Sequence, residues 1–98
     1  VDIPVLPTLA DGLAGAIDAH GLDVGRHALD DIVVVEEEEV GAAIAFLARE
    51  ENVIAEGSGA VGVAALLGGA VHAADPVVVV ISGGNIDPEV LDRVKRQR

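Results

Sequence analysis

Ser82 is the first candidate for chemistry, because it follows a run of five β-branched residues, 77–81, and precedes Gly83 and Gly84. The run predicts a strand buried on both faces, as in parallel sheets with helices on each side. In such sheets ligands bind beyond the carboxyl ends of the strands, where glycines allow close backbone approach. Ser82 is therefore a candidate binding residue. The alternative is a tight turn in which Ser82 acts as a cap and Asn85 takes a left-handed conformation.

Glu56 is a second candidate, since it directly precedes residues 57–62, which have the spacing G-x-G-x-x-G. In dinucleotide-binding proteins this pattern joins a strand to a helix, and an acid about 20 residues on, at the end of the next strand, binds the ribose. Here the next predicted strand ends at Ser82, and the Glu56 carboxylate would repel a phosphate. The glycines therefore favour close helix–sheet packing, or the approach of a smaller ligand, over a dinucleotide.

Asp11 is the third candidate, in the first turn of a helix predicted from Thr8 to about His20. Thr8 and Asp11 have the spacing of a capping box, with an aspartate where Glu or Gln is usual. The Asp11 carboxylate could satisfy helix N–H groups or face a site near this helix end. Gly12, next to it, would allow a ligand or a neighbouring backbone to come close. Both interpretations stay open.

Other polar clusters point to structure more than to chemistry. The four carboxylates of residues 36–39 could form a cation site, but they also occupy the first turn of a predicted helix, where the dipole favours negative charge. The histidines do not form pairs with the spacing of metal ligands on a helix, so we do not expect a metal site. These histidines are His20, His27 and His72.

The elements that must position these residues alternate along the chain. Short apolar runs predict strands at residues 32–35, 53–55 and 77–81, with helices between and around them. Such alternation predicts an α/β fold, a small parallel sheet with helices on both faces and right-handed crossovers. We expect residues 1–98 to form a single α/β unit.

Two of the predicted helices have clear signals. In the one that follows Glu39, apolar residues recur with helical spacing on one face. The last helix has Asp87 as N-cap, Pro88 at its first position and cations at its end, as the helix dipole prefers. The apolar residues of the first of these helices are Val40, Ala43, Ile44 and Leu47.

Composition narrows the class of protein. The chain has 98 residues, 17 acidic against 6 basic ones, and a formal net charge of −11. Such a surface repels phosphate backbones and anionic lipid, so we expect no nucleic-acid or membrane partner and a cytoplasmic location. An acidic surface with a single lysine and a core of small side chains also favours a high-salt source. The lack of cysteine excludes disulfides and thiolate metal sites.

Four motifs together resemble the C-terminal part of the catalytic region of the threonine ammonia-lyase (threonine dehydratase) and serine racemase family. These are fold-type II pyridoxal-phosphate enzymes, so the resemblance implies that the chain is part of their large domain. It covers nearly the whole chain, and four motifs in register are more specific than any one of them. The motifs are LADGLAG (9–15), DDIVVVEEEEVGAAIAFL (30–47), AEGSGAVGVAALL (55–67) and VVVVISGGNID (77–87).

The resemblance implies a role for the SGGN turn. In such enzymes its serine hydrogen-bonds the pyridine nitrogen of pyridoxal 5'-phosphate, which assigns Ser82 to that position and Gly83, Gly84 and Asn85 to cofactor binding. A hydroxyl cannot hold a full pyridinium charge as a carboxylate would. The ring would then withdraw electrons less strongly than a full pyridinium, which is compatible with β-elimination from a small hydroxy amino acid.

The resemblance also implies roles for the other two candidates. Glu56 matches the acid that approaches the face of the cofactor. Asp11 and Gly12 match a segment that lines the substrate pocket, with Gly12 also counted among the cofactor-binding residues.

Several parts of the family's machinery have no counterpart here. The Schiff-base lysine, the asparagine under the ring, the glycine-rich phosphate cup and the divalent-cation ligands all lie upstream in the family, and Lys95 stands in a basic C-terminal run. We therefore expect the isolated chain to be inactive, and to be a truncated, proteolysed or separately obtained part of a parent enzyme that converts threonine or serine to a 2-oxo acid and ammonia.

Exposed apolar edges should then pair with the remainder of the catalytic domain or with further copies in a homo-oligomer. The alternative is a non-catalytic α/β module that kept the fold and binds another chain.

Overall fold

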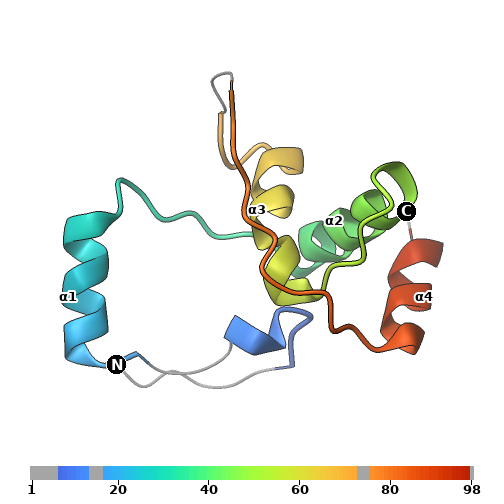
Figure 1. Ribbon diagram of the computed structural model, residues 1–98, viewed down its shortest axis with the longest axis horizontal. Helices are drawn as coiled ribbons and strands as arrows, with labels where there is room; N and C mark the ends of the chain where they lie inside the picture. The colour runs from blue at the N-terminus through green and yellow to red at the C-terminus, as the bar shows by residue number, and fades with distance from the viewer. Residues whose placement is uncertain (1–6, 14–16, 73–75, 98) are drawn as a thin grey trace.

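The computed structural model describes residues 7–13, 17–72 and 76–97, and within these ranges its regular structure is helical. A 3-10 turn, η1, precedes the α-helices α1 to α4. Figure 1 shows α2, α3 and α4 grouped as one body and α1 apart from them. The bounds are η1 (Asp11–Leu13), α1 (Ala19–Ala28), α2 (Glu37–Glu50), α3 (Gly57–Leu67) and α4 (Pro88–Arg96).

The core lies where α2 packs against α3 on one side and against α4 on the other. Ile44 of α2 is 1% exposed, and burial of such a side chain contributes about 1.5–3 kcal/mol. Alanines at the contact let the helices approach closely. The buried core residues are Val40, Ala43, Ile44, Leu47, Ala55, Ala60, Val63, Ala64 and Val94.

The predicted helix after the glutamate run is confirmed, as is the last helix. In α2 the apolar face predicted from the sequence is buried. In α4 the Asp87 side chain accepts a hydrogen bond from the Glu89 N–H at 2.8 Å, and Pro88 occupies the first turn. Both helices therefore form where local sequence signals and burial agree.

The predicted α/β fold is wrong. In the described residues the three apolar runs, 32–35, 53–55 and 77–81, form no strand and no small parallel sheet. Figure 1 shows 77–81 as an extended segment that passes along α3. A strand needs a neighbour whose N–H and C=O groups pair with its own, and in the described residues none of the three runs pairs with another. The runs have the residue types of strands but lack the pairing.

The predicted first helix, from Thr8 to about His20, is also wrong. Residues 11–13 form only the short turn η1, and α1 begins later, where the Asp18 side chain accepts from the Gly21 N–H at 2.7 Å. Glycine costs a helix about 1 kcal/mol relative to alanine, and Gly12 lies in the first predicted turn. A stronger N-cap downstream therefore defines the helix.

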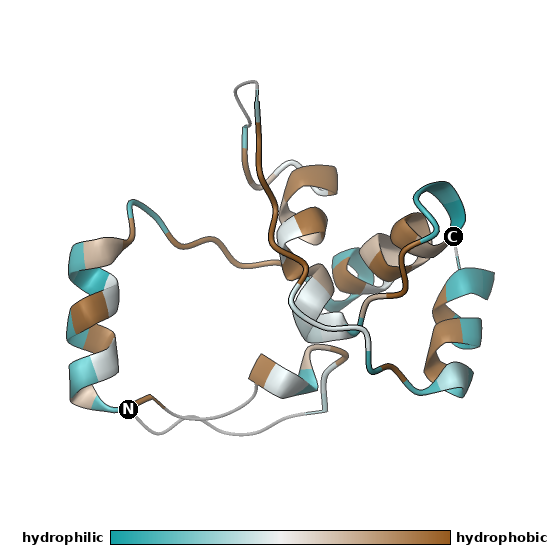
Figure 2. Ribbon diagram, viewed as in Figure 1, coloured by the Kyte–Doolittle hydropathy of each residue, from teal (hydrophilic) through white to brown (hydrophobic). Residues whose placement is uncertain are grey.

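Apolar side chains remain exposed outside the body. No residue of α1 is buried, and this helix contacts none of the other helices. In the two extended segments Val34 is 85% exposed and Val78 is 89% exposed. Figure 2 shows both segments as continuous apolar stretches. No helix in the described ranges has the length and apolarity that a membrane crossing requires.

Candidate functional site

The SGGN turn lies directly on the first turn of α3. The Glu56 N–H donates to the Gly83 carbonyl oxygen at 3.0 Å. A Cβ atom placed on Gly59 would lie 2.8 Å from that oxygen and 3.4 Å from the Ser82 nitrogen. Only a residue without a side chain at position 59 allows this contact between the backbones. The structure thus brings Ser82 and Gly83 to the N-terminal end of α3, next to Glu56.

The segment that contains Asp11 and Gly12 packs against the same helix end. A Cβ on Gly12 would lie 2.7 Å from the Ser58 Oγ and 3.9 Å from the Glu56 Oε2. η1 and α3 are in contact here. Two segments that are separated by more than forty residues in the sequence therefore meet beside Glu56.

The Glu56 carboxylate is half-buried between these two segments. Its Oε1 lies against the Gly83 backbone so closely that a Cβ at that position would overlap it, and its Oε2 faces Gly12. The neighbouring Gly84 approaches the Ile54 carbonyl oxygen in the same way, with a Cβ expected at 2.6 Å. The glycines of the SGGN turn thus serve close approach.

The turn does not use a left-handed conformation at Asn85. Among the described residues a positive φ occurs at Asn52, at 54°, and at Gly69, at 78°. The alternative interpretation of the SGGN segment, a tight turn with a left-handed Asn85, is therefore wrong, because residues 82–85 are irregular and extend to the N-cap of α4. Ser82 and Asn85 are both exposed, so their side chains are accessible to a ligand.

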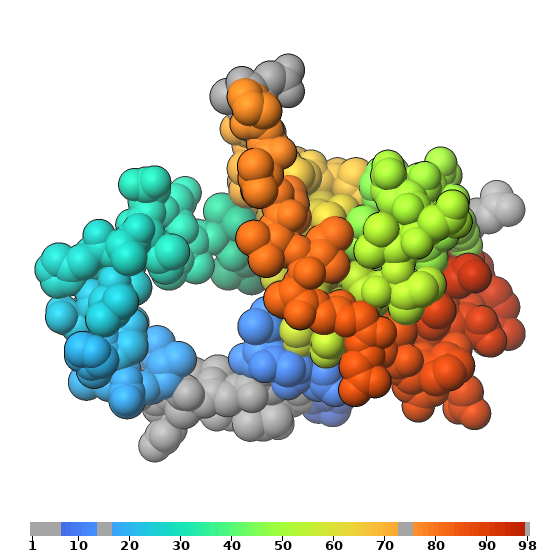
Figure 3. Space-filling view, viewed as in Figure 1, coloured from blue at the N-terminus to red at the C-terminus, as the bar shows by residue number. Residues whose placement is uncertain are grey.

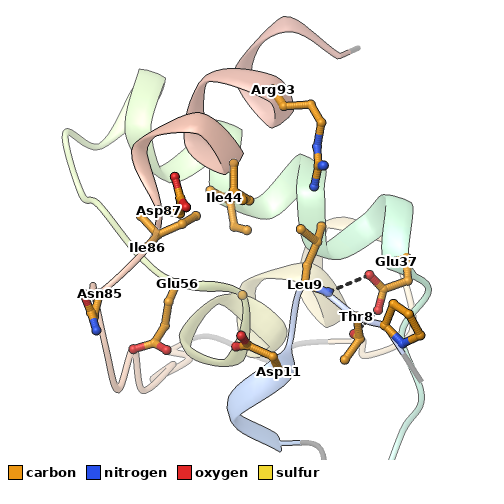
Figure 4. Close-up of a pocket in the computed structure, with 13 residues that line it drawn as sticks. Thr8, Leu9, Asp11, Glu37, Ile44, Glu56, Asn85, Ile86, Asp87 and Arg93 are labelled. Carbon is orange, nitrogen blue, oxygen red and sulfur yellow. Dashed lines mark hydrogen bonds between the residues drawn. The ribbon is translucent and has the colours of Figure 1, made fainter. Parts of the chain in front are cut away.

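A cavity of 360 Å³ opens beside Asn85, whereas Ser82 is not among the residues that line it. Asp11, Glu56 and Asn85 line it together with apolar residues, which include Leu9 and Ile44 of the core. Figure 4 shows the Glu56 and Asp11 carboxylates on the same side of the cavity as Asn85. Arg93 lines it as well and contributes a positive charge among several carboxylates. The cavity thus offers both acidic and basic groups over an apolar surface.

Two residues near the site were not identified from the sequence. The Ser58 Oγ is a buried side-chain oxygen without a hydrogen-bond partner in the described part of the chain. Glu37 accepts hydrogen bonds from Thr8 and from the Leu9 N–H, far away in the sequence. The glycine spacing around Ser58 indicated close packing there, whereas no local signal indicated the long-range contact of Glu37.

The G-x-G-x-x-G segment is not a loop. Its glycines all lie within α3, and Gly59 packs on the SGGN turn while Gly62 faces Val79, with a Cβ expected 2.8 Å from the Val79 Cγ1. The interpretation as close helix packing is therefore confirmed, although the neighbour is an extended segment and not a sheet. Gly15, the last residue of the first motif, lies outside the described residues.

Comparison with known proteins identifies the family. The profile of the family described as "Pyridoxal-phosphate dependent enzyme" matches residues 1–83. The L-threonine ammonia-lyase of Thermotoga maritima is 45% identical over 91 residues, which are 90% of this chain and 22% of that protein. The L-threonine ammonia-lyase of Geobacter sulfurreducens is 41% identical over 98 residues, 96% of this chain and 24% of that protein.

A serine racemase of Oryza sativa is more distant, at 33% identity over 97 residues, which are 93% of this chain and 29% of that protein. The chain thus spans about a quarter of the length of these relatives. The resemblance stated from the four sequence motifs is confirmed. The chain belongs to the family of pyridoxal-phosphate dependent enzymes, in which its relatives are threonine ammonia-lyases and serine racemases.

Proposed function

We propose that this chain is part of the catalytic region of an ammonia-lyase that converts threonine or serine to a 2-oxo acid and ammonia. One observation supports the proposal most directly. Residues from three separate motifs, 11–12, 56 and 82–85, converge at the N-terminal end of α3. Figure 4 shows one residue of each motif, Asp11, Glu56 and Asn85. Side chains that act on one ligand have to meet in space, and these three residues line the same cavity.

The residues at this place fit one end of pyridoxal phosphate. Ser82 is exposed and can be reached by a ring, whereas the absent side chains of Gly83 and Gly84 leave room for the Glu56 carboxylate and the Ile54 carbonyl oxygen. We assign Ser82 to the pyridine nitrogen, and Gly12 and Asn85 would also help to hold the cofactor. The phosphate end finds no counterpart, because the glycines of α3 are packed inside a helix that begins next to Glu56.

The bound cofactor would supply an electron sink for bonds at the substrate α-carbon. Ser82 contributes a neutral hydrogen-bonding group, which leaves the pyridine nitrogen less positive than a carboxylate partner would. Glu56 offers a half-buried carboxylate whose Oε2 faces Gly12, where it can accept a proton or a hydrogen bond. Asp11 is exposed on the cavity wall, where a carboxylate attracts the ammonium group of an amino acid.

The chain does not provide an amine at this cavity. Its single lysine, Lys95, is exposed in the last turn of α4 and does not line the cavity. An imine-forming lysine would have to come from elsewhere in a longer polypeptide, the parent enzyme. We propose that catalysis belongs to that parent and that its location is cytoplasmic.

The remainder of the catalytic domain is the partner we propose for the exposed apolar segments 32–35 and 77–81. Their side chains would be buried and their backbone groups paired by neighbouring strands. Figure 3 shows that 77–81 projects from the body on the face in view. Without the remainder of the catalytic domain the chain should self-associate, which light scattering over a range of concentrations can measure. A strictly monomeric species at every concentration would contradict this proposal.

Ammonia release from threonine and serine by the parent enzyme tests the proposed function. We expect Ser82→Ala and Glu56→Gln to lower kcat/KM by about tenfold or more each. This is the effect expected from the loss of one polar or charge-assisted hydrogen bond in the transition state. Asp92→Ala, an exposed position on α4, is the control and should leave kcat/KM unchanged. Full activity in both variants, or no lyase activity in the parent, would overturn the proposal and favour a non-catalytic module.

A further inference from the structure

The short stretch before η1 is held by Glu37 of α2, which also lines the cavity but has no role assigned above. Both oxygens of the Glu37 carboxylate accept hydrogen bonds from this stretch, Oε1 from the Thr8 hydroxyl and Oε2 from the Leu9 N–H at 2.9 Å. Figure 4 shows the Glu37 side chain reaching from the first turn of α2 to the backbone at Leu9. One carboxylate thus ties two consecutive residues to a helix that begins almost thirty positions later in the chain.

Further hydrogen bonds link the residues held by Glu37 to η1. The Ala10 N–H donates to the Thr8 Oγ1 at 3.1 Å, and the Leu13 N–H donates to the Ala10 carbonyl oxygen at 3.0 Å, which closes η1. Asp11 and Gly12 lie inside this turn. Their position relative to Glu56 therefore depends on where residues 8–10 are held.

The other contacts of this stretch are packing contacts. Leu9 packs at the edge of the core, and its carbonyl group lies directly over Gly57 of α3, where a Cβ would overlap it. Apolar packing of this kind is not directional. Hydrogen bonds to a fixed carboxylate are directional, so Glu37 is the group that defines the register of the stretch.

This role belongs to Glu37 alone within the acidic run. The Glu39 side chain turns back to accept a hydrogen bond from the Glu36 N–H at 2.8 Å, which closes the start of α2. Glu38 lies on another face of the helix, at a hollow next to Phe46 and Gln97. All of these acids interact with the helix dipole, but only Glu37 reaches residues 8 and 9.

We propose that Glu37 is a positioning residue that holds Asp11 and Gly12 against Glu56. The consequence for activity rests on the proposed function, since Asp11 and Gly12 matter to a substrate only if this is its pocket. The contact itself does not depend on that function, so it can be tested separately in the 98-residue chain.

Amide hydrogen exchange, read residue by residue by NMR, tests the contact. In Glu37→Ala we expect exchange at Leu9 and Ala10 to become about tenfold faster, as the loss of a charge-assisted hydrogen bond implies. Glu37→Gln keeps one acceptor oxygen on the same stem, so it should give a smaller increase. Glu38→Ala removes the same charge from the same turn and should leave Leu9 and Ala10 unchanged.

The pattern separates positioning from a general loss of helix stability. If Glu37 acted only through the dipole of α2, Glu38→Ala and Glu37→Gln would have the same effect as Glu37→Ala, and exchange would rise throughout α2. That result would overturn the proposal. So would unchanged exchange at Leu9 and Ala10 in Glu37→Ala.

Kinetics of the parent enzyme test the consequence. A displaced pocket wall should raise KM for the amino acid severalfold more than it lowers kcat, and Glu37→Gln should restore most of the loss. Equal kinetics in wild type and Glu37→Ala would overturn the link to the site even if exchange had changed. A parent without any lyase activity would refute the proposed function instead and would leave the exchange result to decide on the contact.

Discussion

Gly59 offers a direct test of how the SGGN segment packs against α3. In the interior of a helix, alanine is favoured over glycine by about 1 kcal/mol, so Gly59→Ala should stabilise the chain if nothing else were in contact. The structure opposes this expectation, because the new Cβ would lie 2.8 Å from the Gly83 carbonyl oxygen and 3.0 Å from the Gly83 nitrogen. Both atoms belong to the backbone, which cannot rotate away as a side chain can.

Gly62, one turn further along α3, is the matched control. A Cβ there would lie 2.8 Å from the Val79 Cγ1, the end of a side chain that can change its rotamer at a cost of about 0.5–1.5 kcal/mol. The overlap at Gly59 should cost about 1–3 kcal/mol, as insertion of a methyl group into packed surroundings does. The gain in helix propensity is no larger at Gly59, in the first turn of α3, than at Gly62 in its interior. Gly59→Ala should therefore be less stable than Gly62→Ala by about 1–2 kcal/mol.

Urea denaturation followed by far-ultraviolet circular dichroism measures this difference, since the chain has neither Trp nor Tyr for fluorescence. NMR shifts of the Ser82 and Gly83 amides should move in Gly59→Ala and stay near their wild-type values in Gly62→Ala. If Gly59→Ala is as stable as Gly62→Ala and these amides do not move, the SGGN turn is not seated on α3 as described.

Two further predictions concern the core and the surface charge. Ile44→Ala should lower the free energy of unfolding by about 2–5 kcal/mol, because Ile44 is 1% exposed. Leu67 is 51% exposed, so Leu67→Ala should change this free energy by less than about 0.5 kcal/mol. Similar losses for the two variants in the same urea titration would contradict the assigned core. With a net charge of −11, the chain should be more stable in molar salt than at low ionic strength. In molar salt the Debye length is about 3 Å, so the repulsion between neighbouring carboxylates is screened. Equal unfolding midpoints at the two salt concentrations would remove the argument for a high-salt source.

The sequence by itself determined the elements in which a local signal and burial agree. The apolar spacing of Val40, Ile44 and their neighbours predicts α2, and Asp87 with Pro88 predicts the start of α4, because caps and amphipathic faces are encoded within a few residues. The four motifs in register also indicated the family, which the comparisons confirm. These features need no knowledge of what lies opposite.

The tertiary structure alone decided what depends on partners distant in the chain. The runs 32–35 and 77–81 are apolar enough for strands, yet a strand exists only where a neighbour completes its hydrogen bonds, and in the described residues none does. The meeting of Asp11, Gly12, Glu56 and the SGGN turn at one helix end likewise arises from packing against Gly57 and Gly59. So does the reach of Glu37 to Thr8 and Leu9, because no pattern within a short window relates groups that become neighbours only when the chain folds.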